Sequence, residues 1–302
     1  MAYIHLLTQT ISGMAPVYSF FERMKIREEL AEKYPDLNEG EIEEVLEYKL
    51  GGGRERTGSK IFENIHRLQQ EFILYANDRD KQLLCAAKLI NYGELMRREY
   101  IAPGKYSFFS QFGGKDELRR SGGWGISNEI PEEVKLALDV DYIDGNFIDY
   151  VSEHVRHVFL GRDIYQKVKI LRKYNLGTCE ETTRSAIVVN YDEKLGIYLP
   201  AWAVAETLVH EAAHIEYFYK YADDPQRHEI DKAERYAYIK GMIYLDGLYQ
   251  KICRDDEIDE TTKMMVEYEY NFWRNKVNML NLRLGKYPGP KKHGGHARSH
   301  NQ

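Results

Sequence analysis

The chain has 302 residues, of which 43% are hydrophobic, so it can form one large domain or two smaller ones with buried cores. It carries 42 basic and 48 acidic side chains, and a net charge of −6 does not favour binding to a phosphate backbone. We therefore expect no nucleic-acid partner. The three cysteines include no CxxC pair, which argues against a disulfide framework and indicates a reducing, cytoplasmic setting. No stretch is apolar enough to predict a signal peptide or a membrane helix.

The first part of the chain has the pattern of a helical region. Apolar residues recur at spacings of three and four from about residue 20 to 100. Asn38 followed by Glu41 matches a capping box at the start of a helix, and the glycines at 51–53 end that helix. We therefore predict a helical N-terminal region over residues 1–110, which is also where a protein partner could bind.

Glycine-rich sequence separates this region from the rest of the chain. It has no sustained period, so we place a linker at residues 111–130. A second domain is predicted over residues 131–285, followed by a disordered tail over residues 286–302. Within the second domain, the pattern favours one long helix from about residue 142 to 174.

The second domain also carries a strand signal. SAIVVNY at residues 185–191 is rich in β-branched residues, DEKLG resembles a turn, and IYL follows, so we expect a β-hairpin. Pro200 suits the first turn of the next helix, and Asp224 with Pro225 starts the helix after that. Together these elements predict an α+β fold that is mostly α-helical.

The run LVHEAAHIEY at residues 208–217 is the strongest chemical signal. On an α-helix, His210 and His214 lie one turn apart on the same face, so both imidazoles can bind one metal ion. Glu211 lies about 100° around the helix axis. From there its carboxylate can reach a water molecule on the open side of the ion. This arrangement is typical of a metal-dependent hydrolase, with zinc as the ion and Glu211 as the general base.

A metal ion held by two histidines needs a third protein ligand, and the next predicted helix offers one. Glu234 follows His214 after a short connection, so two antiparallel helices would bring its carboxylate to the same ion. Its small neighbours on that helix would allow close approach to another helix. Glu229 and Asp231 are local alternatives for the third ligand.

HEAAH followed by a glutamate on the next helix resembles the gluzincin branch of the zincin metallopeptidases, with the ligand spacing of thermolysin-like enzymes. The resemblance covers about residues 184–242. It implies a zinc peptidase in which His210, His214 and Glu234 hold the ion, Glu211 is the catalytic base, and the substrate is a peptide or protein. It also implies a zincin-like domain with a short sheet before the active-site helix. The edge strand of that sheet, AIVVNY here, would bind substrate in extended form.

The chain departs from the related patterns at several positions. Tyr217 and Lys220 stand where the metzincin pattern requires glycine and histidine, so that branch is excluded. Tyr238 stands where thermolysin-like enzymes have an aspartate that supports a histidine ligand, and Asp231 is a candidate to replace it. The donor that stabilises the oxyanion of the transition state stays open, with His228, Tyr238 and Tyr217 as candidates.

Two other classes of protein remain alternatives. A ferritin-like di-iron protein uses Glu-x-x-His pairs, and this chain has two of them, Glu63 with His66 and Glu211 with His214. Glu153 lies between these pairs as a further carboxylate. The other alternative is a non-catalytic regulatory or binding protein with a structural zinc. One zinc ion per chain would support the hydrolase, whereas two iron ions would support the di-iron protein.

Overall fold

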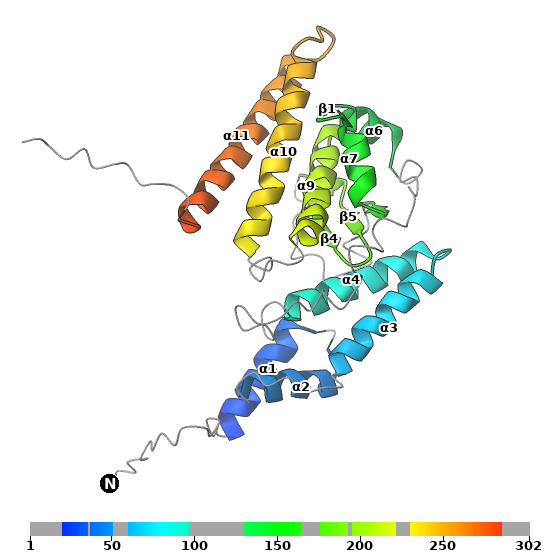
Figure 1. The fold of residues 1–302 in the computed structure, drawn as a ribbon, viewed down its shortest axis with the longest axis vertical. Helices are drawn as coiled ribbons and strands as arrows, with labels where there is room; N and C mark the ends of the chain where they lie inside the picture. The colour runs from blue at the N-terminus through cyan, green and yellow to red at the C-terminus, as the bar shows by residue number, and fades with distance from the viewer. Residues whose placement is uncertain are drawn as a thin grey trace, which may run out of the picture. The chain divides into compact units, whose positions relative to one another are not determined.

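The computed structural model divides the chain into two compact units, Met1–Phe112 with Tyr165–Lys173, and Gly113–Ile164 with Tyr174–Gln302. Most described residues are helical and a few form short strands, which confirms the predicted α+β, mostly α-helical class (Figure 1). Within the described ranges, each helix is too short or too polar to cross a lipid bilayer. The described residues are 20–35, 37–50, 60–96, 130–162, 164, 176–192, 195–221 and 230–285.

The described part of the first unit is helical. The predicted capping box is confirmed, because the backbone N–H of Asn38 donates to Glu41 and the backbone N–H of Glu41 donates to the Asn38 side chain. The carboxylate of Glu41 is buried and also accepts hydrogen bonds from Asn64 and Tyr92, which joins three helices. The helices of this unit are α1 (Phe20–Lys33), α2 (Glu39–Leu50), α3 (Lys60–Leu74) and α4 (Arg79–Leu95).

One central helix, α9 (Ala201–Lys220), forms much of the core of the second unit. It begins directly after Pro200, as expected, and its side chains Leu208 and Ile215 are fully buried. Helix α11 packs on α10, which lies between α11 and α9 (Figure 1). The helices that pack on α9 are α6 (Glu132–Leu138), α7 (Phe147–His154) and α10 (Ile230–Ile252), and α11 spans Glu260–Arg283.

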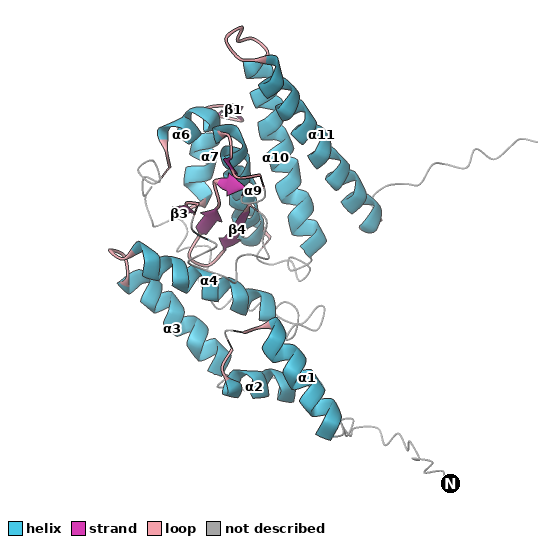
Figure 2. Ribbon diagram, turned by 180° about the vertical axis from the view of Figure 1, so that it is seen from behind, coloured by secondary structure: helices cyan, strands magenta, loops and turns pink. Residues whose placement is uncertain are grey.

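A small sheet packs against α9 (Figure 2). Its strands are β3 (His157–Leu160), β5 (Ser185–Val188) and β4 (Gly177–Glu180), in that order across the sheet. Strand β5 is the central strand, parallel to β3 and antiparallel to β4. Two short hairpins complete the described strands: β1 (Asp141–Tyr142) with β2 (Gly145–Asn146), and β6 (Tyr191–Asp192) with β7 (Ile197–Tyr198).

The long helix predicted from about residue 142 to 174 is wrong over the described part of that range. A tight turn at Ile143, which has a φ of 47°, forms the β1–β2 hairpin instead. Asn146 then caps the short helix α7, and at Val155 the backbone becomes extended and leads into β3. Apolar spacing alone suggested a helix, but the pairing of β3 with β5 depends on residues far away in the sequence.

The hairpin predicted for residues 185–199 is also different in detail. Strand β5 pairs with β3 and β4, and the hairpin is the shorter β6–β7 pair. The expectation that AIVVNY forms an edge strand is therefore wrong. All four residues of β5 are buried, as is usual for a strand covered on both faces. Strand β4 lies at the edge of the sheet beside α9.

Several sequence predictions fall on residues that the structure does not describe. They concern the linker, of which only Ile130 is described, the start of a helix at Asp224 and Pro225, and the tail at 286–302. The domain limits proposed from the sequence therefore stay predictions.

Candidate metal centre

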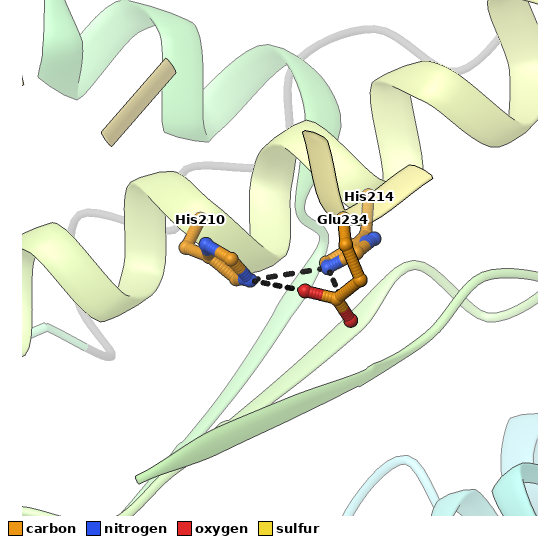
Figure 3. A group of neighbouring side chains, drawn as sticks. All are labelled: His210, His214 and Glu234. Atoms are coloured by element: carbon orange, nitrogen blue, oxygen red, sulfur yellow. Dashed lines mark hydrogen bonds and ion pairs between the residues drawn. The ribbon is translucent and has the colours of Figure 1, made fainter. Parts of the chain in front are cut away.

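His210 and His214 lie on consecutive turns of α9, and Glu234 lies near the start of α10. Because α10 packs along α9, the three side chains converge (Figure 3). The Nε2 atoms of the two histidines are 3.1 Å apart, and the Glu234 carboxylate approaches each of them to 3.7 Å. Their ligand atoms all lie within 4.8 Å of one another. The structure thus brings the three residues chosen as metal ligands into one group.

The spacing of these atoms fits a tetrahedral zinc ion. Bonds of about 2.0–2.1 Å place neighbouring ligand atoms of a tetrahedron about 3.3 Å apart. The two Nε2 atoms are 3.1 Å apart, and each lies 3.7 Å from a different oxygen of Glu234, Oε2 for His210 and Oε1 for His214. Each nitrogen–oxygen pair is therefore close to that spacing, and a single carboxylate oxygen would move by a small amount to reach both partners of an ion. The side chains of His210, His214 and Glu234 are 13%, 15% and 33% exposed, so an ion held there would also reach water. Such access is expected of a catalytic metal site, whereas a structural site is closed.

The alternatives for the third ligand differ in position. Asp231 is one turn before Glu234 on α10, but its carboxylate pairs with Arg283 of α11 at 3.7 Å. Glu229 lies outside the described residues. Of the candidates that the structure describes, Glu234 is therefore the one beside the two histidines.

Apart from His214, the residues of the di-iron alternative do not join this group. In the part of the chain that is described, His210, His214 and Glu234 make the sole cluster of three possible metal ligands. Glu63 and His66 are exposed on α3, and Glu153 is exposed on α7. Glu211 belongs to the same helix turn as the histidines but does not face the cluster as a ligand.

Glu211 is buried between α9 and strand β4. Its side chain is only 6% exposed. Burial raises the pKa of its carboxyl to about 8, and the negative charge of Glu234 adds to that rise. A hydrogen bond with the Cys179 thiol of β4 acts in the opposite direction. A cation bound by Glu234 and the histidines would favour the charged form of Glu211.

Gly177 of β4 makes the close approach of the strand to α9 possible. A Cβ atom at this position would lie 2.5 Å from the Thr207 methyl group and 2.9 Å from a carboxylate oxygen of Glu211. Residues two apart on a strand face the same side, so Gly177 and Cys179 both face Glu211. Strand β4 therefore covers the face of α9 that carries Glu211 and limits the movement of its carboxylate.

Aromatic rings enclose His210. Its ring centroid lies 4.9 Å from that of Tyr238 and 5.8 Å from that of Trp273. Burial and the neighbouring His214 lower the pKa of His210 well below its usual value. The imidazole is thus kept neutral, which is the form that binds metal. Burial raises the pKa of Tyr238, and a hydrogen bond with Glu234 raises it further, so this tyrosine supports the third ligand and stays protonated.

Glu206 was not selected from the sequence, yet it lies beside the cluster. Glu206, His210 and His214 are spaced four apart, so they share one face of α9. The Glu206 side chain is 5% exposed, and one of its carboxylate oxygens has no hydrogen-bond partner among the described residues. Gly241 of α10 leaves room for it, because a Cβ atom there would lie 2.7 Å from that oxygen. The sequence signal that could have identified Glu206 was its position four residues before His210.

The other residues considered for oxyanion stabilisation are placed differently. Tyr238 adjoins both His210 and Glu234, as described above. The Tyr217 ring is buried and packs against Tyr221 and Tyr236, with centroid distances of 4.7 and 5.4 Å. His228 lies outside the described residues. Among the described candidates, Tyr238 is the one in contact with the candidate metal ligands His210 and Glu234.

A buried charge network fixes α9 against α10 a short way from the cluster. Glu216 of α9 forms an ion pair with Lys240 of α10 at 3.0 Å and accepts a hydrogen bond from Tyr150 of α7 at 2.8 Å. The ammonium group of Lys240 also lies over the rings of Tyr142, Tyr150 and Tyr236. Since the candidate metal ligands come from both helices, this network helps to set their separation.

Comparison of the chain with protein-family models, with curated proteins and with solved structures gives no match in any of the three. The chemistry of the site is therefore argued from its own residues.

Proposed function

We propose that the protein is a zinc-dependent metallopeptidase that hydrolyses peptide bonds. The observation that carries the proposal is the convergence of His210, His214 and Glu234, whose possible ligand atoms lie within 4.8 Å of one another. Two imidazoles and one carboxylate leave a coordination position for water, as in catalytic zinc sites. The partly exposed side chains agree with such an open position.

The residues around the cluster have roles that fit this reaction. When bound, zinc would supply a water with a pKa of about 7 and would polarise the carbonyl of the substrate. Glu211 accepts a proton from the attacking water and delivers it to the leaving amine. Strand β4 and Gly177 hold its carboxylate in place for both transfers. Tyr238 is the candidate donor to the developing oxyanion, because its hydroxyl group lies beside Glu234.

We further propose that a peptide or protein substrate binds in extended form along β4. This strand lies at the edge of the sheet and passes directly over Glu211. An edge strand offers backbone groups to an added strand, which gives affinity without dependence on particular side chains. The proposed setting is the cytoplasm, since the three cysteines are free.

Metal analysis and one substitution test the proposal. The purified chain should contain one zinc ion, and a chelator should abolish hydrolysis of a peptide library until zinc is restored. Glu211→Gln should keep zinc but lose hydrolysis, because an amide cannot accept the proton from water. Glu63→Gln makes the same chemical change at an exposed position on α3 and should leave zinc content and activity unchanged.

Two outcomes would reject the proposal. Two iron ions per chain, lost in the Glu63→Gln variant, would support the di-iron alternative. A chain that keeps zinc, cleaves no peptide in the library and unfolds when zinc is removed would support a structural zinc in a non-catalytic protein.

A further inference from the structure

Helix α11 presents two apolar faces. One packs on α10 and buries Val266, Val277 and Leu280. The other lies on nearly the opposite side of the helix and is exposed. We call this second face the α11 stripe. It consists of Met265, Tyr268, Phe272, Asn275, Met279 and Leu282.

The α11 stripe follows the repeat of a coiled coil. Its positions alternate between steps of three and four residues, which keeps a single seam along the helix. Five of the six side chains are apolar, and each is between 39% and 71% exposed to solvent. The exposed fractions are 48% for Met265, 71% for Tyr268, 39% for Phe272, 47% for Met279 and 66% for Leu282.

We propose that a second copy of this chain covers the α11 stripe, so that two α11 helices pair in parallel as a two-stranded coiled coil. The two copies would be related by a two-fold axis along the seam, and each would bury the same residues. Helix α11 packs along α10 (Figure 1), and its Trp273, which lies beside His210, is on nearly the opposite side of the helix from the stripe. The proposal does not depend on the function of the candidate metal centre.

The α11 stripe would form the apolar centre of a dimer interface. A stable interface buries about 800 Å² on each partner, so residues on both flanks of the stripe would be buried together with its five apolar side chains. Helix α11 is already formed in the single chain, where it packs along α10, so dimerisation requires no further free energy to nucleate it.

Asn275 decides the direction of the two helices. It is the single polar residue of the α11 stripe. In a parallel pair it faces Asn275 of the second copy, and the two amides can hydrogen-bond to each other across the seam. In an antiparallel pair with the stripes fully overlapped, it would face Phe272, which offers an amide no partner. Burial of an unsatisfied amide is costly, so the parallel arrangement is favoured.

The charges beside the α11 stripe also permit the parallel pair. In a parallel coiled coil, one flank of each helix meets the other flank of its partner. Each charged side chain would therefore meet an uncharged one, and like charges would not oppose one another. One flank holds Glu269, Lys276 and Arg283, and the other holds Met264, Asn271 and Asn278.

Sedimentation velocity over a range of concentrations tests the pairing. The full chain should form dimers, and Met265→Glu or Met279→Glu should weaken dimerisation about 30-fold or more, as expected for a buried contact residue. Ile243→Glu is the matched control, because this apolar residue of α10 is 45% exposed and lies outside the stripe. A monomer at high concentration, or a dimer equally sensitive to Ile243→Glu, would overturn the proposal.

A cysteine placed at position 275 tests the direction. The background carries Cys253→Ser, since Cys253 is the exposed native thiol among the three. Under mild oxidation, Asn275→Cys should give a disulfide-linked dimer, because parallel helices place the two residues opposite each other. The same variant with Met265→Glu added should not cross-link. If Asn275→Cys chains dimerise but do not cross-link, the parallel arrangement is wrong. If the chain dimerises only when another kind of molecule is added, the proposal that it pairs with itself is wrong.

Discussion

Glu206 and His210 lie one turn apart on α9, and each has a buried polar atom without a hydrogen-bond partner among the described residues, a carboxylate oxygen and Nδ1 respectively. A histidine that binds metal through Nε2 carries its proton on Nδ1 and needs an acceptor for it. Figure 3 shows Nδ1 of His210 directed away from His214 and Glu234. The Glu206 oxygen and Nδ1 do not bond to each other in this structure, and we predict that Glu206 accepts this hydrogen bond and orients His210 when an ion is bound.

Glu206→Gln should lower zinc affinity by about 10- to 100-fold, the usual effect of losing such a support. Competition with a chromophoric chelator would measure it. Glu206→Asp, which keeps the charge on a shorter side chain, should restore part of the affinity, whereas exposed Glu63→Gln should change nothing. Equal affinities in the Glu206→Gln variant and the native chain would show that another group supports His210.

Gly177→Ala should reduce hydrolysis strongly and leave zinc bound. The added Cβ would meet Thr207 at 2.5 Å and Glu211 at 2.9 Å, so either β4 or the Glu211 carboxylate must shift. A displacement of about 1 Å at a catalytic group can lower the rate about 100-fold. Steady-state kinetics with a fluorogenic peptide, together with zinc analysis, would check this.

Thr207→Ser offers a partial rescue of that variant. It removes the methyl group that makes the closest of these contacts. The double variant should therefore be faster than Gly177→Ala alone. Full activity in Gly177→Ala would mean that β4 does not hold Glu211 in its working position.

Lys240→Met should destabilise the second unit by about 3 kcal/mol or more, because it leaves the Glu216 carboxylate without its buried partner. Lys220→Met is the matched control. Lys220 also pairs with Glu216, at 3.7 Å, but its side chain is 53% exposed, against 12% for Lys240. Its loss should cost less than about 1 kcal/mol. Denaturant unfolding would measure both, and similar losses would contradict the role of the buried network.

His154 should make the stability of the protein depend on pH. Its ring packs against Tyr150 with centroids 4.8 Å apart, and burial lowers its pKa. Below about pH 6.5 the unfolded chain therefore binds a proton that the folded chain does not. The stability contributed by the neutral ring is complete above that pH and is lost as the pH falls towards the folded pKa. The charged groups around the ring are Glu216, Glu153, Arg184 and Lys240.

His154→Phe keeps an aromatic ring but cannot take up the proton. In the native chain the free energy of unfolding should fall by at most about 1.4 kcal/mol per pH unit from this group. The variant should lose that part of the slope, as measured by denaturant unfolding at several pH values between about 5 and 7. An unchanged slope would assign the pH dependence to other groups.

Local spacing was enough to predict the parts of the site that lie on one helix. His210 and His214 follow from the geometry of a single turn, and the capping box at Asn38 and Glu41 follows from four consecutive residues. Glu234 required one further step, a pair of neighbouring helices. The structure places it beside the histidines, whereas Asp231 pairs with Arg283.

Features that depend on distant residues were not predicted. Strand β3 exists because it pairs with β5, and the same pairing puts β5 in the centre of the sheet and β4 at its edge. The place of Glu206 depends on Gly241 of another helix, which no pattern within α9 reveals. Local periodicity therefore located most of the described helices, but it predicted one helix where the chain forms β1, β2, α7 and β3, and it could not assign the strand order or the position of Glu206.

All three ligand atoms of the metal centre come from the helical hairpin α9–α10, which is continuous in sequence. An ion bound there would close a short loop of chain, and closing a loop removes conformations from the unfolded state. In a chain whose three cysteines are free, a coordinated ion would act on this hairpin as a cross-link. Refolding in the presence of the ion would then begin from two segments that are already tethered.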